Sequence, residues 1–262
     1  MKRRPPLLDF EDVVLMRGGA RVLDGLTFRI SRGENTAILG PNGSGKSSLL
    51  KLLTRELYPV ANDRPYRMRI LGRESWDLFS LRAHLGIVTN DLQAEFAREC
   101  SGWEAVVSGF FSSIGLWANH RVSPAMERKA WSVLERLEVA PLADRLMTAM
   151  SAGEARRMLI GRALIHDPDT LILDEPTTSL DLRAAREFRA TIRKLVRAGT
   201  SLLLVTHTFE EVIPEITRVI LLREGRVFRD GPKKDVLTEA NLSSLYGLPV
   251  RLDVDDGTYH VR

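Results

Sequence analysis

The segment from Gly40 to Ser48 has the composition of a loop that binds phosphate. It reads GPNGSGKSS, and Gly40, Gly45, Lys46 and Ser47 fit the pattern G-x-x-x-x-G-K-[ST]. Glycines allow the backbone to curl around phosphate oxygens and to point its N–H groups inward. The residues expected to line this loop are Gly40, Pro41, Asn42, Gly43, Ser44, Gly45, Lys46, Ser47 and Ser48.

Lys46 and Ser47 indicate that the phosphates belong to a nucleoside triphosphate. Lys46 is expected to reach the β- and γ-phosphates, and Ser47 is expected to bind Mg²⁺ through its hydroxyl. The loop follows an apolar segment, residues 35–40, and precedes residues 47–57, whose leucines recur at helical spacing. A strand, a loop and a helix in this order are the context that the motif requires.

The segment TLILDEP, from Thr170 to Pro176, is a second candidate site because it places two carboxylates at the end of an apolar strand. A charge at the end of a buried strand is costly unless a cation or a polar ligand faces it. Asp174 suits Mg²⁺ coordination, and Glu175 suits a base that polarises an attacking water.

His207 follows the next apolar strand, in the segment LLLVTHT. In a parallel sheet its side chain would emerge at the same edge as Gly40 and Asp174. A histidine at a strand end is often a structural residue, but beside a γ-phosphate it would donate to the phosphate or orient the water. We therefore predict Glu175, His207 and Lys46 as the catalytic residues.

The segment MSAGEARRM predicts the start of a helix. Ser151 and Glu154 have the spacing of a capping box, in which each side chain hydrogen-bonds to the backbone of the other residue. A helix start also has unused N–H groups and a positive end that can meet a phosphate. From the residues alone, both roles remain open.

Apolar periodicity predicts the elements that must position these residues. Residues 7–39 and 58–87 indicate short strands, and residues 91–149 are typical of helices. After Ser151 the pattern alternates between helices at 154–165, 182–198 and 209–216 and strands at 170–175, 201–207 and 218–225. Alternation of this kind predicts a parallel sheet covered by helices.

Composition excludes several classes of protein. The 262 residues hold 38 Lys and Arg against 34 Asp and Glu, and the net charge of +4 is spread along the chain, which gives only weak support for a nucleic-acid partner. Cys100 is the single cysteine, so a reducing compartment is expected. No apolar run reaches the roughly 20 residues of a membrane helix, and acidic residues from Asp9 onward argue against a secretion signal.

The order of these motifs resembles that of the ATP-binding cassette, the nucleotide-hydrolysing subunit of ABC transporters, over essentially the whole chain. In that family a signature of the type Leu-Ser-Gly-Gly-Gln binds the γ-phosphate of the nucleotide that the partner domain holds. The matching residues here are Met150, Ser151, Ala152, Gly153 and Glu154. The resemblance therefore implies that Ser151 begins half of a site completed by dimerisation. It also implies that Asp181 crosses the dimer interface.

Several positions depart from the family pattern. Ala152 replaces a glycine and would crowd a phosphate, while Glu154 replaces a glutamine and adds a negative charge near the anion. Arg17 stands where an aromatic residue normally stacks on adenine, and a guanidinium plane can also stack. The amide expected beside Mg²⁺ and the attacking water is Asn90 by position or Gln93 by residue type.

The segment from Ser101 to Trp117 resembles the helical-lobe entry of cassettes that serve iron-complex or molybdate-type importers. In the family this lobe docks a coupling helix of the membrane subunit. Five apolar residues could form such a docking patch or could fill the core of the lobe. They are Phe110, Phe111, Ile114, Leu116 and Trp117. Lys233 and Lys234 are expected to be an ordinary surface pair.

These inferences predict an α/β fold: a P-loop NTPase with a mostly parallel sheet core, an N-terminal antiparallel β subdomain and an inserted helical lobe. One domain is expected, with a RecA-like core at about 7–90 and 151–235, a lobe at about 91–150 and a C-terminal extension at about 236–262.

The function implied is that of an importer ATPase that uses ATP and Mg²⁺. Its expected partners are a second copy, a multi-span permease and a substrate-binding protein, on the cytoplasmic face of the membrane. The alternative is a cassette ATPase that acts on nucleic acid or ribosomes without a membrane partner. Nucleic acid is the less favoured partner, because the basic charge is its only support.

Overall fold

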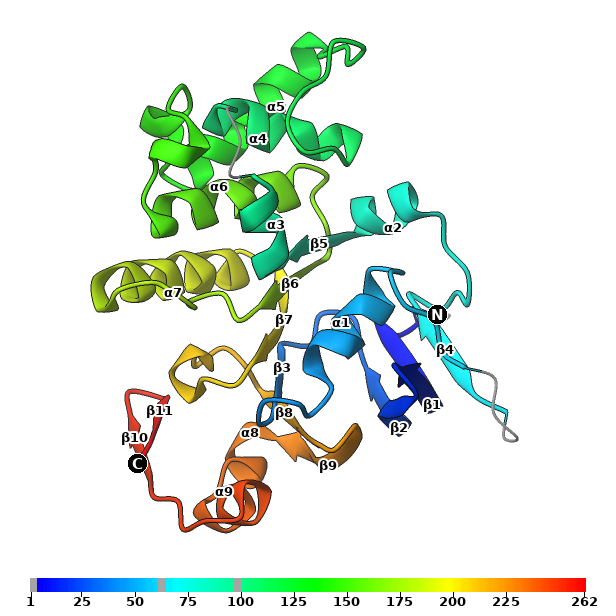
Figure 1. The fold of residues 1–262 in the computed structure, drawn as a ribbon. Helices are drawn as coiled ribbons and strands as arrows, with labels where there is room; N and C mark the ends of the chain where they lie inside the picture. Colours follow the sequence, from blue (N-terminus) through cyan, green and yellow to red (C-terminus); the bar gives the residue numbers. More distant parts are fainter. Residues whose placement is uncertain (1–3, 61–64, 97–99) are drawn as a thin grey trace. The chain divides into compact units, whose positions relative to one another are not determined.

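The structure is a computed structural model that describes residues 4–60, 65–96 and 100–262, without the side chains of Asn90 and Gln93. The chain divides into two compact units. The first unit is Met1–Leu78 with Ser201–Arg262, and the second is Phe79–Thr200. Figure 1 draws the elements of both units, which are described separately below. Within the described residues, no helix is long and apolar enough to cross a membrane.

The first unit begins with an antiparallel sheet in the strand order β2-β1-β4. Its strands are β1 (Leu8–Arg17), β2 (Ala20–Ile30) and β4 (Arg67–Ile70). Gly18 and Gly19 join β1 to β2 with φ angles of 56° and 80°, which glycine adopts without a steric penalty. The predicted N-terminal antiparallel subdomain is therefore present.

The parallel strands of the first unit carry the residues that precede the phosphate loop and His207. Strand β3 (Thr36–Leu39) pairs in parallel with β7 (Ser201–Thr206) and with β8 (Arg218–Arg223). Strand β9 (Arg226–Pro232) pairs antiparallel with β8. Every residue of β3 and β7 is buried, as expected for central strands of a covered parallel sheet.

Helix α1 (Lys46–Leu53) follows the phosphate loop and is shorter than the sequence predicts. Four of its leucines, Leu49, Leu50, Leu52 and Leu53, are buried as their spacing predicts. The helix stops because Arg55 adopts a φ of 61° and the N–H groups of Glu56 and Leu57 both turn back to the Lys51 carbonyl.

The helix predicted at residues 209–216 is wrong, because the structure has only the 3₁₀ turn η4 (Phe209–Glu211) there. Pro214 explains the error, since a proline has no N–H to donate and disfavours helical backbone at the residue before it. The apolar residues Val212, Ile213 and Ile216 are nevertheless buried.

The first unit ends with α8 (Lys233–Val236), α9 (Glu239–Tyr246) and a hairpin of β10 (Leu252–Asp255) and β11 (Thr258–Val261). The prediction that Lys233 and Lys234 form an ordinary surface pair is wrong for Lys233. Its Nζ is partly buried and donates to the carbonyls of Ile213 and Pro214, both at 3.2 Å.

The second unit combines two parallel strands with a group of helices. The strands are β5 (Leu85–Val88) and β6 (Thr170–Asp174). The helices are α2 (Leu78–His84), α3 (Asn90–Glu95), α4 (Gly102–Val107), η1 (Ser108–Phe111), α5 (Pro124–Arg136), η2 (Ala140–Leu142), η3 (Met147–Ala149), α6 (Ala152–Leu164) and α7 (Leu182–Arg197). Helices α4, α5 and α6 pack together, and Gly161 allows the approach, because a Cβ there would lie 3.1 Å from Val106.

Candidate nucleotide site

The phosphate loop needs glycine at two positions for different reasons. Gly45 has a φ of 103°, and a Cβ on it would lie 2.7 Å from a methyl group of Leu23. A Cβ on Gly40 would overlap the backbone carbonyl of Leu222. The loop is therefore seated directly on the backbone and side chains of β2 and β8, and its curl depends on glycine.

Lys46 lies inside this loop with only 6% of its surface exposed. Its Nζ donates to the carbonyl oxygens of Gly40 at 2.8 Å and of Pro41 at 3.1 Å. The hydroxyl of Ser44 is buried beside it and has no hydrogen-bond partner among the residues that the structure describes. A buried ammonium and an unpaired hydroxyl in a glycine cradle suit a phosphate group.

Ser47 occupies the first turn of α1 and is exposed. The first turn of the helix contains no acidic residue, so its positive end is open to an anion. The role of the Ser47 hydroxyl as a ligand of Mg²⁺ stays a prediction.

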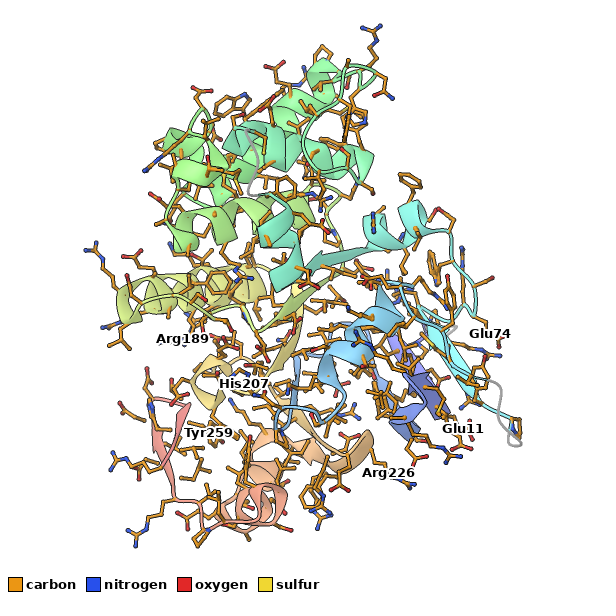
Figure 2. All side chains as sticks on the ribbon, in the orientation of Figure 1. Glu11, Glu74, Arg189, His207, Arg226 and Tyr259 are labelled. Atoms are coloured by element: carbon orange, nitrogen blue, oxygen red, sulfur yellow. The ribbon has the colours of Figure 1, made fainter. Side chains whose placement is uncertain are left out.

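His207 lies at the same strand edge as the phosphate loop, as predicted. Leu39 of β3 and Thr206 of β7 are register partners, so Gly40 and His207 both follow directly after paired residues. The Thr206 hydroxyl accepts the N–H of Thr208 at 2.9 Å and so fixes the turn at which His207 stands. The His207 side chain is exposed, and Figure 2 labels it.

Asp174 and Glu175 end a strand of the second unit. Val88 and Leu173 are register partners, so Thr89 of the β5 edge and Asp174 of the β6 edge follow directly after them. Asp174 and Glu175 are both partly buried. Glu175 has a φ of 43°, a left-handed backbone that is unusual for a residue other than glycine.

Asn90 and Gln93 both belong to α3, and their side chains lie outside the part of the chain that the structure describes. The preceding residue, Thr89, caps this helix, because its hydroxyl accepts the N–H of Leu92 at 3.3 Å. The choice between the two amides therefore stays a prediction.

The helix start at Ser151 is a complete capping box. The Ser151 hydroxyl accepts the N–H of Glu154 at 3.3 Å, and the Glu154 carboxylate accepts the N–H of Ser151 at 2.7 Å. These hydrogen bonds lower the pKa of Glu154, and Arg145, 3.7 Å from the carboxylate, adds to the effect. The negative charge of Glu154 therefore interacts with the backbone at the start of its own helix and with Arg145.

Gly153 lies where α6 packs on α7, and Asp181 lies at the start of α7. A Cβ on Gly153 would lie 3.2 Å from the Cβ of Ala184, so the glycine lets the two helices approach closely. Asp181 is the N-cap of α7, and its Oδ1 accepts the N–H of Ala184 at 2.7 Å. Ala152, the first residue of α6, is partly buried.

Two further observations concern residues at the surface. Arg17 is exposed at the end of β1, directly before the Gly18-Gly19 turn.

None of the apolar residues of the possible docking patch is fully buried, and 57% of Trp117 is exposed, which favours a surface over a core role. Two of the patch residues contact histidine rings: Phe110 meets His166 edge to face, and Phe111 stacks on His120.

Sequence reasoning missed Arg145 and Lys233. Arg145 precedes the signature by several residues, and no spacing rule connects it with Glu154. Lys233 contacts a segment about twenty residues earlier, and a pair of lysines after a proline gives no signal of that contact. Only the fold brings these residues to their partners.

A glycine-lined loop between a buried parallel strand and a helix, with an enclosed lysine, defines a P-loop protein that binds and hydrolyses nucleoside triphosphates. The sequence pattern of the ABC transporter family matches residues 23–178, and the chain belongs to this family. It is therefore an ATPase of the ABC transporter class, and the predicted P-loop fold with a mixed, mostly parallel sheet is confirmed.

Known relatives match almost the full chain. An uncharacterised ABC transporter ATP-binding protein of Bacillus subtilis, YlmA, is 35% identical over 94% of this chain and 93% of its own length. A hemin import ATP-binding protein of Streptomyces coelicolor, HmuV, is 32% identical over 90% of this chain and 81% of its own length. The crystal structure of an ATP-binding cassette of an ABC transporter in its ADP conformation is similar, with a TM-score of 0.77, 25% identity and coverage of 92% and 98% of the two chains.

Proposed function

We propose that the chain is the ATP-hydrolysing subunit of an ABC importer. The observation that carries the proposal is the glycine cradle that encloses Lys46, together with the similarity to a hemin import subunit. Two copies would bind two ATP molecules between them, and hydrolysis would drive a separate membrane permease between its access states. A substrate-binding protein would deliver the transported molecule.

The reaction is the transfer of the γ-phosphoryl group of ATP to water. The water oxygen bonds to the γ-phosphorus while the bond from that phosphorus to the bridging oxygen breaks, so that ADP leaves. Glu175 takes the proton from the attacking water, and His207 donates a hydrogen bond to the γ-phosphate. Lys46 balances negative charge on the β- and γ-phosphates, and its two carbonyl partners hold it in the loop until phosphate binds.

Ser47, Asp174 and an amide of Asn90 or Gln93 are the residues that would hold Mg²⁺. Hydroxyl, carboxylate and amide oxygens are the ligands this ion prefers. When bound, Mg²⁺ offsets negative charge on the phosphates. Arg17 would stack on the adenine ring.

Ser151 and Asp181 are the residues through which each copy would complete the site of the other. In the capping box the Ser151 oxygen is an acceptor, so its hydroxyl proton remains available for a phosphate oxygen. The exposed start of α6 adds a positive helix end to that contact. Glu154 accepts a hydrogen bond from Ser151 and lies near Arg145. These two partners would reduce the repulsion between its carboxylate and the phosphate.

The partner of the apolar patch would be the permease. Trp117 and its half-buried neighbours offer an apolar surface that suits a helix of a membrane subunit. The chain would then work at the cytoplasmic face of the membrane, which the permease crosses.

Glu175→Gln tests the assignment of the base. We expect this variant to bind ATP normally and to lose turnover by about 100- to 10,000-fold, because the amide cannot accept the proton. Steady-state phosphate release and equilibrium binding of a fluorescent ATP analogue measure the two effects. Glu74→Gln, at an exposed carboxylate of the first unit, is the matched control and should match the native rate. Unchanged phosphate release by Glu175→Gln would reject the assignment.

A further inference from the structure

The segment that follows His207 is held by side chains from the C-terminal part of the chain. Strand β11 packs on η4, the turn that begins two residues after His207. Figure 1 shows the hairpin of β10 and β11 beside this segment, within the first unit.

Two contacts from the hairpin reach the segment between Phe209 and Pro214, and a buried tyrosine stands on the same hairpin. Tyr259 is 7% exposed, although it lies on a short hairpin whose other strand is mostly exposed. His260 Nδ1 lies 3.7 Å from Glu210 Oε1. Gly257 lies directly against Pro214, where a Cβ would come within 3.2 Å of the proline ring.

Lys233, the first residue of α8, contacts the same segment between Phe209 and Pro214. Its Nζ donates to the carbonyls of Ile213 and Pro214 and lies 5.5 Å from the centre of the Tyr259 ring, over its face. Burial lowers the pKa of the Lys233 ammonium. Burying a charged ammonium costs free energy unless it has polar partners. The two carbonyls and the Tyr259 ring are the partners that offset this cost for Lys233.

Movement of this segment would be transmitted to His207. Only Thr208 separates His207 from the buried Phe209, and the Thr208 N–H is tied to the Thr206 hydroxyl. On the far side, the ring of Phe209 meets the ring of Tyr246 in α9, with centroids 6.2 Å apart. The backbone at His207 is thus held between the end of β7 and the C-terminal contacts.

We propose that Tyr259 and Lys233 are positioning residues for His207. They hold the segment from Phe209 to Pro214 and so set the position of the imidazole during ATP turnover, which affects hydrolysis and leaves nucleotide binding unchanged. The proposal rests on the proposed role of His207 in hydrolysis. Figure 2 labels both His207 and Tyr259.

Tyr259→Ala and Tyr259→Phe in the full chain test the proposal. We expect Tyr259→Ala to lower kcat by about tenfold with little change in KM or in the binding of a fluorescent ATP analogue, because a displaced catalytic group slows only the chemical step. Tyr259→Phe keeps the ring over Lys233 and should restore the native kcat. Val254→Ala removes an exposed apolar side chain from the same hairpin and should leave kcat unchanged.

Two outcomes of this experiment would overturn the proposal. One is a native kcat in folded Tyr259→Ala, and the other is a parallel loss of ATP binding and kcat, which indicates a general structural defect. If circular dichroism finds Tyr259→Ala unfolded, Lys233→Met decides the question, because it keeps the aliphatic stem and removes the hydrogen bonds to the two carbonyls. A native kcat in Lys233→Met would then overturn the proposal.

A double variant separates this inference from the function on which it rests. If Tyr259 acts through His207, then Tyr259→Ala should cause no further loss of kcat in a His207→Ala background. A further loss of about tenfold there would overturn the positioning role while the role of His207 stands. A native kcat in His207→Ala alone would reject the proposed role of His207, and the positioning inference with it.

Discussion

At the scale of single residues, Glu154 has the most informative environment of the signature residues. Its carboxylate accepts the N–H of Ser151 and lies near Arg145, so the replacement of the family's glutamine by glutamate adds a charge with local partners. The charge also lies in the first turn of α6, where the helix dipole favours an anion.

The capping role of Glu154 predicts a pH-dependent contribution to stability. The pKa of Glu154 is lowered on folding from its ordinary value of 4.5, chiefly by the hydrogen bond from the Ser151 backbone. The contribution is therefore fully present above pH 4.5 and is lost as the pH falls through the lowered pKa. Glu154→Gln should cost about 0.5–1 kcal/mol of unfolding free energy at pH 7 and less at acidic pH.

Urea unfolding of the native chain and of Glu154→Gln at pH 7 and below pH 4 measures this difference. Glu127→Gln, at another carboxylate in the first turn of a helix, provides a comparison without the reciprocal capping box. A difference between native chain and Glu154→Gln that is equal at both pH values would contradict the expectation.

The phosphate loop is predictable at the residue scale because its chemistry is local. Gly40, Gly45 and Lys46 lie close together in sequence, and the required curl and the lysine follow from their types. The ion pair of Glu154 with Arg145 and the contacts of Lys233 are not predictable in this way. They depend on where distant backbone segments meet, which the spacing of single charged residues does not encode.

At the scale of elements, the close approach of α6 and α7 depends on Gly153. The Cβ of Ala184 occupies the space that a side chain at Gly153 would need. The glycine that the family uses beside phosphate therefore also has a packing role in this chain. A single position serves both the helix start and the contact between helices.

Gly153→Val is expected to lower the unfolding free energy by about 1–3 kcal/mol, because the larger side chain must push α7 away from α6. Chemical denaturation followed by circular dichroism measures this loss. Ala190→Val introduces the same side chain at an exposed position of α7 and should cost less than about 1 kcal/mol. Equal losses in the two variants would argue against the packing role.

Several elements follow from apolar periodicity, but helix α2 lies within residues 58–87, where the pattern predicted short strands. Strands such as β3 and β7 and helices such as α6 and α7 agree with the predicted segments. The predicted helix at 209–216 fails because the apolar residues there have helical spacing while Pro214 interrupts the hydrogen bonds. Periodicity reports which residues are buried, and it does not report whether the backbone between them can be helical.

At the scale of the whole molecule, the proposal places the two halves of each site on different copies of the chain. One copy would supply the phosphate loop and the other would supply the start of α6. If hydrolysis needs both, the specific activity must rise with protein concentration, because the active species is a dimer.

Ser151→Arg should abolish hydrolysis, because its long cationic side chain replaces the hydroxyl at an exposed helix start, while ATP still binds to the phosphate loop of each copy. Phosphate release over a range of protein concentrations, with binding of a fluorescent ATP analogue, measures both properties. Ser123→Arg, at the exposed cap of α5, is the matched control. Native hydrolysis by Ser151→Arg, or a specific activity independent of concentration, would refute the composite site.

The left-handed backbone of Glu175 would oppose stability to catalysis at one position if Glu175 is the base. A side chain other than glycine at a φ of 43° costs on the order of 1 kcal/mol, which the surrounding fold must offset. Glycine would relax the backbone there and also delete the carboxylate. If Glu175 is the base, as proposed, selection for stability alone would favour a replacement that ends turnover.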